Sequence, residues 1–214
     1  MEQNKDSAEN KDQDWRLLLI DNKNFDQKVE YSLDKVIQHF DILTQDLDHL
    51  NPYHFFSAIY EFTKAFKRFS NALSMGFSDI TEKVQVWRNL FKIHSETEIN
   101  DIQSLMQKEM ACGLQNLNGE NNSKLGHKKG TTYYNYVSGC RTMVRLSWFL
   151  NFLYQTFKNM LNSTDPFNTC IKKAYESALG PHHNWIIKKS VGLILNAAGS
   201  NREPALLAFF GKFF

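Results

Sequence analysis

Two pairs of charged residues, each spaced four positions apart, could bind an anion. Asp79 and Lys83 occur in SDITEK, and Arg141 and Arg145 occur in CRTMVRL. On an α-helix four positions make about one turn, so each pair projects from one helical face. The residues directly after Arg145 are mostly apolar and should enter a core. The pattern therefore predicts two guanidinium groups at the edge of an apolar interior, where an amphiphile with an anionic head group would fit.

A phosphate head group suits three of these four side chains. Arginine offers a planar pair of N–H donors and lysine a point charge, and both form charge-assisted hydrogen bonds with phosphate oxygens. Asp79 would repel a phosphate unless its carboxylate accepts a hydrogen bond from the ligand and the nearby cations offset its charge. Taken singly, each pair is also what an ordinary solvated helix surface shows, so the interpretation depends on both pairs occurring together.

No pattern in the chain indicates catalysis. It lacks an HExxH motif, a glycine-rich phosphate loop, and a convincing Ser/His/Asp or Cys/His arrangement for nucleophilic chemistry. His127, His182 and His183 could suggest a metal, but no carboxylate or thiol partner is evident beside them in the sequence. We therefore expect a binding protein rather than an enzyme, with no metal and no cofactor.

The net charge of +2 hides an asymmetry along the chain. The first 14 residues contain two lysines and five acidic residues, so the rest of the chain carries about +5. That excess is enough to favour an anionic ligand or membrane surface. It is far short of the basic stripe of a nucleic-acid-binding protein, so we expect no nucleic-acid partner.

Cysteine usage and hydropathy bear on the compartment. Cys112, Cys140 and Cys170 show no CxxC spacing, which favours a reducing environment. The N-terminal segment MEQNKDSAENKDQD is polar, unlike a secretory signal, and no run of 18 apolar residues occurs. We therefore expect a cytoplasmic monomer that associates with membranes peripherally and reversibly.

Apolar residues recur every three or four positions through most of the chain, which indicates helices. The expected helices span about 29–50, 55–73, 80–91, 99–114, 133–161, 167–179, 185–198 and 203–214. Residues 116–130 are rich in Asn, Gly and Lys and should form a surface loop. No useful alternating strand pattern occurs, so the expected class is all-α. A polar acidic tail at 1–14 would precede one domain of packed helical layers at 15–214.

Three sequence blocks, in order, carry a family resemblance. They are the helix with Asp79 and Lys83, the block SGCRTMVRL that contains both arginines, and ALGPHHNW at 178–185. From about Tyr53 to the end, roughly three quarters of its length, the chain resembles the glycolipid transfer protein superfamily. Within it, the ceramide-1-phosphate transfer proteins are most similar. The resemblance implies a two-layer sandwich of about eight helices, with a sphingolipid head-group site on its surface and an apolar pocket beneath.

The resemblance also implies a role for each head-group residue. Asp79 would bind the amide of ceramide and His183 would donate to the acyl carbonyl, while Lys83, Arg141 and Arg145 would hold a phosphate. Sugar-binding members have Asn in place of Lys83 and a sugar-stacking Trp in place of Arg145. This chain therefore resembles the phosphate-binding members.

The histidine block departs from the family pattern. The usual His-Pro-Trp reads His183-Asn184-Trp185 here, and an extra His182 precedes it. Either imidazole could face the ligand, and we choose His183 because it keeps the spacing to Trp185. Trp185 could contact a membrane, as the family suggests, or pack in the core.

Helical periodicity predicts which residues line the chain pocket or touch a membrane. These candidates are Phe69, Leu73, Phe149, Phe152, Phe157, Trp185, Ile187, Val191 and Ile194. The apolar C-terminus ALLAFFGKFF could close such a pocket.

The expected function is non-enzymatic transfer of a phosphorylated sphingolipid, similar to ceramide 1-phosphate, between membranes. Two alternatives stay open. One is transfer of a neutral glycosphingolipid, which Lys83 and Arg145 oppose. The other is a lipid sensor or helical scaffold that transfers no lipid.

Overall fold

The computed structural model describes residues 15–21, 25, 30–69, 78–94, 99–119 and 122–210, with residues 67–69 described as backbone only. Two predictions fall outside these residues: the acidic tail at 1–14 and Leu73 as a pocket residue. The predicted role of the Phe69 side chain is likewise outside the description. The segment ALLAFFGKFF, predicted to close the pocket, is described only as far as Phe210, and Ala205, Ala208 and Phe209 of it are buried in the core.

The described chain is helical. Its elements are α1 (Trp15–Ile20), α2 (Leu33–Leu43), α3 (Pro52–Phe69), α5 (Ser78–Ile93), α6 (Ile102–Ala111), the 3-10 helix η2 (Asn122–Leu125), α7 (Gly139–Asn162), α8 (Phe167–Ala178), the 3-10 helix η3 (Gly180–His182), α9 (Trp185–Ala197) and α10 (Arg202–Phe210). Across the described ranges the only β-type pairing is an isolated antiparallel bridge between Asn118 and Val137. The predicted all-α class is confirmed, and α1 is an addition that periodicity did not predict.

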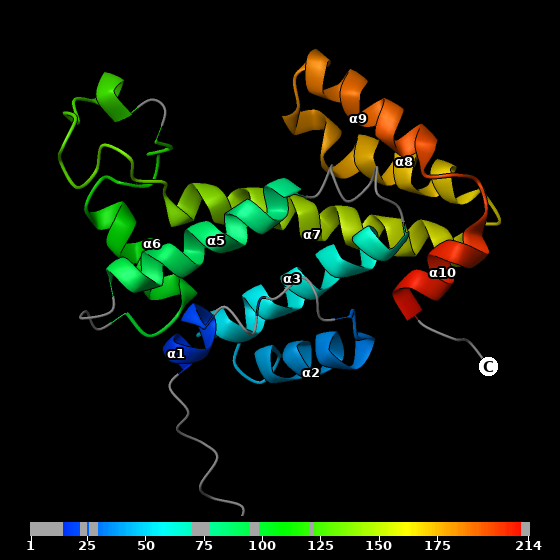
Figure 1. Cartoon of the computed structure of the whole chain (residues 1–214), viewed down its shortest axis with the longest axis horizontal. Coiled ribbons are helices and arrows are strands. Elements are labelled where there is room, and N and C mark those ends of the chain that lie inside the picture. Colours follow the sequence, from blue (N-terminus) through cyan, green and yellow to red (C-terminus); the bar gives the residue numbers. More distant parts are fainter. Residues whose placement is uncertain are drawn as a thin grey trace, which may run out of the picture.

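Helix pairs stack around a central helix, α7 (Figure 1). α7 packs along α8 on one side and against α5 on the other, α5 packs on α3, and α3 packs on α2 and α10. In Figure 1, α8 and α9 lie above α7, whereas α2 and α3 lie below α5. The core between these layers is rich in aromatic rings. Its largest fully buried side chains are Trp87, Phe56, Phe66, Phe91, Phe149, Phe152, Phe167 and Phe209.

The first predicted helix is shorter than its apolar pattern suggested. The Ser32 side chain caps α2 by accepting from the Lys35 N–H at 3.3 Å, and the helix ends at Leu43 rather than near residue 50. Beyond it, the Asp46 carboxylate accepts the backbone N–H groups of Asp48 and His49 at 3.1 and 3.0 Å. A carboxylate that binds its own following backbone competes with helix formation, so the apolar periodicity there continues into turns.

The long central helix begins later than predicted, at Gly139 instead of about Tyr133. The buried Glu109 carboxylate of α6 accepts the N–H groups of Gly139 and Cys140 at 2.6 and 2.8 Å. It also accepts the hydroxyl of Tyr136 at 2.8 Å and that of Ser138 at 2.7 Å. These bonds satisfy the free donors of the first turn of α7, so a residue thirty positions upstream sets where this helix starts.

Gly139 also sets how closely α7 approaches α5. A Cβ at this position would lie 3.0 Å from the Trp87 ring and 3.1 Å from Leu90. Only a glycine allows this contact without moving the ring. Gly139 therefore sets the spacing between the two helices that carry the charged pairs.

Candidate functional site

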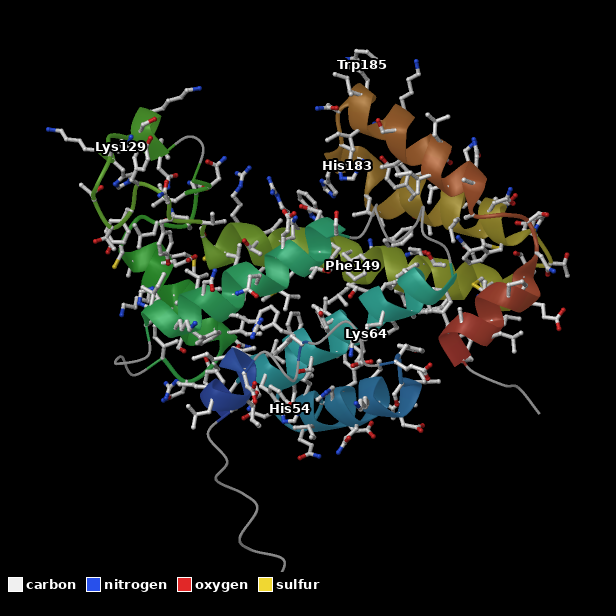
Figure 2. All side chains as sticks on the ribbon, in the orientation of Figure 1. His54, Lys64, Lys129, Phe149, His183 and Trp185 are labelled. Carbon is white, nitrogen blue, oxygen red and sulfur yellow. The ribbon has the colours of Figure 1, made fainter. Side chains whose placement is uncertain are left out.

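The five residues predicted to bind a head group all line one cavity of about 950 Å³. Asp79 and Lys83 come from the first turns of α5, and Arg141 and Arg145 from the first turns of α7. His183 comes from the short segment between η3 and α9. Figure 2 shows His183 on that segment, above α5 and α7. The tertiary structure thus brings together three segments that are far apart in the sequence.

Asp79 and Lys83 form an ion pair that is open on one side. The Lys83 ammonium contacts the Asp79 carboxylate and lies 3.4 Å from the Asp79 carbonyl oxygen. The Lys83 side chain is 8% exposed, whereas the Asp79 side chain is 65% exposed. Burial lowers the pKa of Lys83, the bond to Asp79 opposes that shift, and the charge of Arg145 lowers the pKa further. Lys83 is therefore a desolvated cation beside a second cation, a position that favours an anionic ligand.

The two arginines differ in burial. Arg141 is half-buried, and Arg145 is exposed. The Nε–H of Arg141 is buried and has no hydrogen-bond partner among the described residues. A buried donor without a partner costs free energy that an acceptor entering the cavity would recover. An oxyanion at this position would form an ion pair with the guanidinium and accept a hydrogen bond from the unpaired N–H.

His183 is hydrogen-bonded to a tyrosine of α8. Its Nδ1 lies 2.9 Å from the Tyr175 hydroxyl. Burial lowers the pKa of His183, and the Asp79 carboxylate opposes that shift. The imidazole is therefore neutral near pH 7, with Nδ1 engaged by Tyr175 and Nε2 left for a ligand.

His182, the alternative histidine, also lines the cavity but in another way. Its ring stacks on Trp148 of α7, with centroids 3.7 Å apart and an interplanar angle of 3°. This stack ties the segment before α9 to the middle of α7. His182 forms part of the wall, while His183 is the histidine held beside Asp79.

The predicted pocket residues divide into two groups. Phe149, Ile187 and Val191 line the cavity. Phe152, Phe157 and Ile194 lie outside it and pack in or against the aromatic core. Phe157, for example, lies against Phe209 with ring centroids 5.3 Å apart. Helical periodicity identifies a buried face but cannot distinguish the wall of a cavity from the core behind it.

Trp185, the predicted membrane contact, is 73% exposed at the first turn of α9 (Figure 2). Trp185 therefore does not pack in the core, and its contact with a membrane stays a prediction.

Several lining residues were not predicted. They are Ile80, Met106, Met110, Gln115, Asn116, Cys140, Val144, Trp148 and Leu179. Val144 and Trp148 of α7 could have been found, because Val144 lies three positions after Arg141 and Trp148 three positions after Arg145. Gln115 follows the end of α6 and had no such signal. Burial and then Glu109 raise the pKa of the Cys140 thiol to about 12, which disfavours the reactive thiolate.

Among the described residues, no three or more His, Cys, Asp or Glu side chains form a cluster that could hold a metal ion. Among the described helices, none combines the length and apolar character needed to cross a bilayer.

Comparison with known proteins places the chain in a family. Residues 51–207 match the family model of glycolipid transfer protein. The chain is 25% identical over 165 residues to the ceramide-1-phosphate transfer protein of Danio rerio. The aligned residues cover 76% of this chain and 72% of that protein.

Solved structures share the fold. The crystal structure of mouse ceramide-1-phosphate transfer protein in its apo form has a TM-score of 0.69 at 20% identity, covering 84% of this chain and 81% of that one. The human ceramide-1-phosphate transfer protein in complex with 2:0 ceramide-1-phosphate has a TM-score of 0.68 at 16% identity, covering 85% and 81%. The predicted helical sandwich is thus confirmed, and the chain belongs to the glycolipid transfer protein family.

Proposed function

We propose that this protein binds a phosphorylated sphingolipid and carries it between membranes without altering it chemically. The observation that supports this most is the convergence of Lys83, Arg141 and Arg145 on one cavity, with the Arg141 Nε–H buried and unpaired. Three cationic donors and a single carboxylate leave an excess of positive charge that a phosphate would balance. The relatives described above are ceramide-1-phosphate transfer proteins, and a solved structure of the human one holds 2:0 ceramide-1-phosphate, which supports the proposal.

The remaining polar groups suit the ceramide part of such a lipid. The exposed Asp79 carboxylate can accept from an amide N–H. If the Tyr175 hydroxyl donates to His183 Nδ1, then Nε2 carries the proton and can donate to the acyl carbonyl. The lowered pKa of His183 keeps this neutral tautomer populated near pH 7.

The lipid chains would enter beside the head group. Part of the cavity wall is apolar, with Ile80, Phe149, Leu179, Ile187 and Val191. Moving two chains from a bilayer into water costs about 0.8 kcal/mol per CH₂, or roughly 20 kcal/mol for a ceramide. A carrier must replace that environment, so the cavity would widen between the helical layers when the chains enter.

Helix α9 would make the membrane contact. Its first turns expose Trp185 and Ile186 together with Lys188 and Lys189. Aromatic and aliphatic side chains insert at the lipid interface, and lysines attract anionic head groups. The helix borders the cavity through Ile187, so docking would place the cavity mouth at the bilayer. Association of this kind is peripheral and reversible, as expected of a monomer acting in the cytoplasm.

Vesicle transfer of ceramide 1-phosphate tests the proposal. Arg145→Leu should reduce transfer at least ~10-fold, because a charge-assisted hydrogen bond contributes about 1.5–3 kcal/mol. Lys158→Leu, on the same helix but outside the cavity, should leave transfer unchanged.

Three outcomes would contradict the proposal. A folded Arg145→Leu protein with wild-type transfer would remove the head-group assignment. Faster transfer of glucosylceramide than of ceramide 1-phosphate would favour a neutral glycosphingolipid carrier. No transfer of any lipid, and no lipid found by mass spectrometry in the purified protein, would favour a sensor or scaffold.

A further inference from the structure

Gln115 is an unexplained polar residue in the wall of the cavity. Its Oε1 atom is buried and has no hydrogen-bond partner among the described residues. The phosphate-binding groups proposed above, Lys83, Arg141 and Arg145, are all donors. A doubly ionised phosphomonoester carries only acceptors, so it cannot satisfy the Gln115 oxygen. The cavity therefore contains an acceptor that the phosphate of the proposed ligand leaves unpaired.

The position of Gln115 follows from the directions of α5 and α7. The colours of Figure 1 show that the two helices run in opposite directions. The start of α7, at Gly139, packs against Trp87 and Leu90 in the second half of α5, and the charge of Arg145 acts on Lys83 in its first half. Asp79, at the start of α5, acts electrostatically on His183. The Asp79 end of the cavity is thus opposite to the start of α7.

Gln115 belongs to the end at the start of α7. It follows α6, whose Glu109 caps α7 and whose Met106 carbonyl accepts from the Cys140 thiol at 3.4 Å. Arg141 is at the same end, and Trp148, seven residues later, is about 10 Å further along the helix axis. Along the cavity the order is therefore Asp79 with His183, then the phosphate cations, then Gln115.

This end of the cavity is open to solvent. Met110, Asn116 and Val144 line it, and all three are exposed, so the cavity meets solvent here. A ceramide amide at Asp79 and a phosphate at the cations would direct any substituent on the phosphate away from the ceramide. That direction leads to Gln115.

We propose that the cavity accepts a phosphodiester sphingolipid whose phosphate carries a hydroxyl-bearing substituent, and that Gln115 recognises a hydroxyl of that substituent. A hydroxyl can donate to Gln115 Oε1 and accept from an arginine, so it fits an acceptor placed among donors. An ammonium substituent could only donate, and it would add positive charge to a cationic cavity. This inference rests on the proposed function, because it extends the same head-group site.

Ceramide phosphoinositol and sphingomyelin form the test pair. Both are phosphodiesters of ceramide, but the first carries hydroxyl donors and the second a trimethylammonium group without any donor. Wild-type protein should bind ceramide phosphoinositol at least ~10-fold more tightly than sphingomyelin, as expected when a built hydrogen-bonding site rejects an analogue that lacks its donor. Affinities are measured by competition against a fluorescent ceramide 1-phosphate.

Variants of Gln115 locate the effect. Gln115→Leu should weaken ceramide phosphoinositol about fivefold and change ceramide 1-phosphate less than twofold, since one neutral hydrogen bond is lost. Gln115→Asn keeps the amide but withdraws it by one methylene and should give an intermediate loss. Gln155→Leu, a glutamine on α7 outside the cavity, should have no effect. Thermal unfolding of each variant confirms that the protein is folded.

The inference is overturned if ceramide phosphoinositol binds no better than sphingomyelin. It is also overturned if Gln115→Leu weakens ceramide 1-phosphate as much as ceramide phosphoinositol, because Gln115 would then serve the phosphate or the fold. Either result leaves the proposed function intact, provided that the wild type transfers ceramide 1-phosphate. Failure to bind any phosphosphingolipid would instead remove the proposed function.

Discussion

Two buried lysines in this protein each follow an acidic residue by three or four positions, but the acidic partner is buried in one pair and exposed in the other. Lys64 in α3 pairs with Glu61 three residues earlier at 2.6 Å, and Lys83 in α5 pairs with Asp79 four residues earlier. Their side chains are 7% and 8% exposed. The carboxylates differ, because Glu61 is 6% exposed and Asp79 is 65% exposed. One pair is enclosed in the fold, and the other opens onto the cavity.

The enclosed pair has further partners within the fold. Glu61 also accepts the backbone N–H of Ser32 at 3.3 Å, and the Lys64 ammonium lies over the Tyr60 ring at 5.3 Å. Burial, and then the charge of Glu61, raises the pKa of Tyr31 to about 12, and the Tyr31 hydroxyl donates to the Phe209 carbonyl at 2.8 Å. This network joins α3 to the segments before α2 and at the end of α10.

The open pair is surrounded by further cations instead. Arg145 lowers the pKa of Lys83, and Arg141 lines the same cavity. A buried charge is stable when it is paired, so a cationic cavity with one exposed carboxylate is suited to receive an anion. An acidic residue three or four positions before a lysine therefore predicts an ion pair, but it does not predict whether that pair is enclosed in the fold or open to a ligand.

The largest expected difference between the two pairs is in stability. Lys64→Met should lower the free energy of unfolding by about 3–5 kcal/mol, because it leaves Glu61 buried without its cation. Lys83→Met should cost far less, since Asp79 is mostly in water. Urea denaturation measures both. Equal losses would mean that the two pairs do not differ in the way proposed here.

Exchanging the cations of the open site should change ligand binding rather than stability. Lys83→Asn combined with Arg145→Trp should weaken ceramide 1-phosphate at least ~100-fold, because two charge-assisted contacts are lost. Weak binding of glucosylceramide is the expected gain, limited by Arg141, which stays in place. Equilibrium binding to both lipids checks this, and wild-type affinity for ceramide 1-phosphate would show that these cations are ordinary surface charges.

Removing the exposed carboxylate should affect every sphingolipid alike. Asp79→Val should weaken ceramide 1-phosphate binding at least ~10-fold, because the carboxylate is proposed to read the amide that all sphingolipids share. Helicity by circular dichroism should be unchanged, and Glu176→Val on α8 is the matched exposed control. Wild-type protein that bound phosphatidic acid, which lacks the amide, as tightly as ceramide 1-phosphate would contradict this role for Asp79.

A smaller effect on stability is expected from lowering the pH, through a pair of histidines on α2 and α3. Nδ1 of His39 in α2 lies 2.9 Å from Nδ1 of His54 in α3. Burial and then His54 lower the pKa of His39 to about 4, and burial lowers the pKa of His54. The unfolded chain takes up protons below about pH 6.5, whereas the folded pair resists them.

The free energy of unfolding should therefore fall as the pH drops from about 6.5 toward 4. Urea denaturation between pH 7 and pH 4.5 measures this loss, and it should be smaller than that of Lys64→Met. His39→Phe should flatten the pH dependence. An unchanged pH profile in that variant would assign the acid sensitivity to other groups.

The helical class and the faces of the helices were readable from the sequence, because both follow from local periodicity. The spacing of Asp79 with Lys83, and of Arg141 with Arg145, placed each pair on one face without any knowledge of the fold. The loop at 116–130 was likewise predicted from its composition, and it contains only the short η2 helix among the described residues. Helix ends were predicted less well, since Glu109, a distant residue, determines the start of α7.

Only the tertiary structure decided which faces meet. It enclosed the Glu61–Lys64 pair in the fold and left the Asp79–Lys83 pair open to the cavity. It placed His183 against Tyr175 and put Gln115 in the wall of the head-group cavity. It also assigned Phe152 and Phe157 to the core rather than to the cavity. The physical reason is that hydrophobicity and spacing act along one helix, whereas burial, pairing and cavity shape depend on close packing between segments distant in the chain.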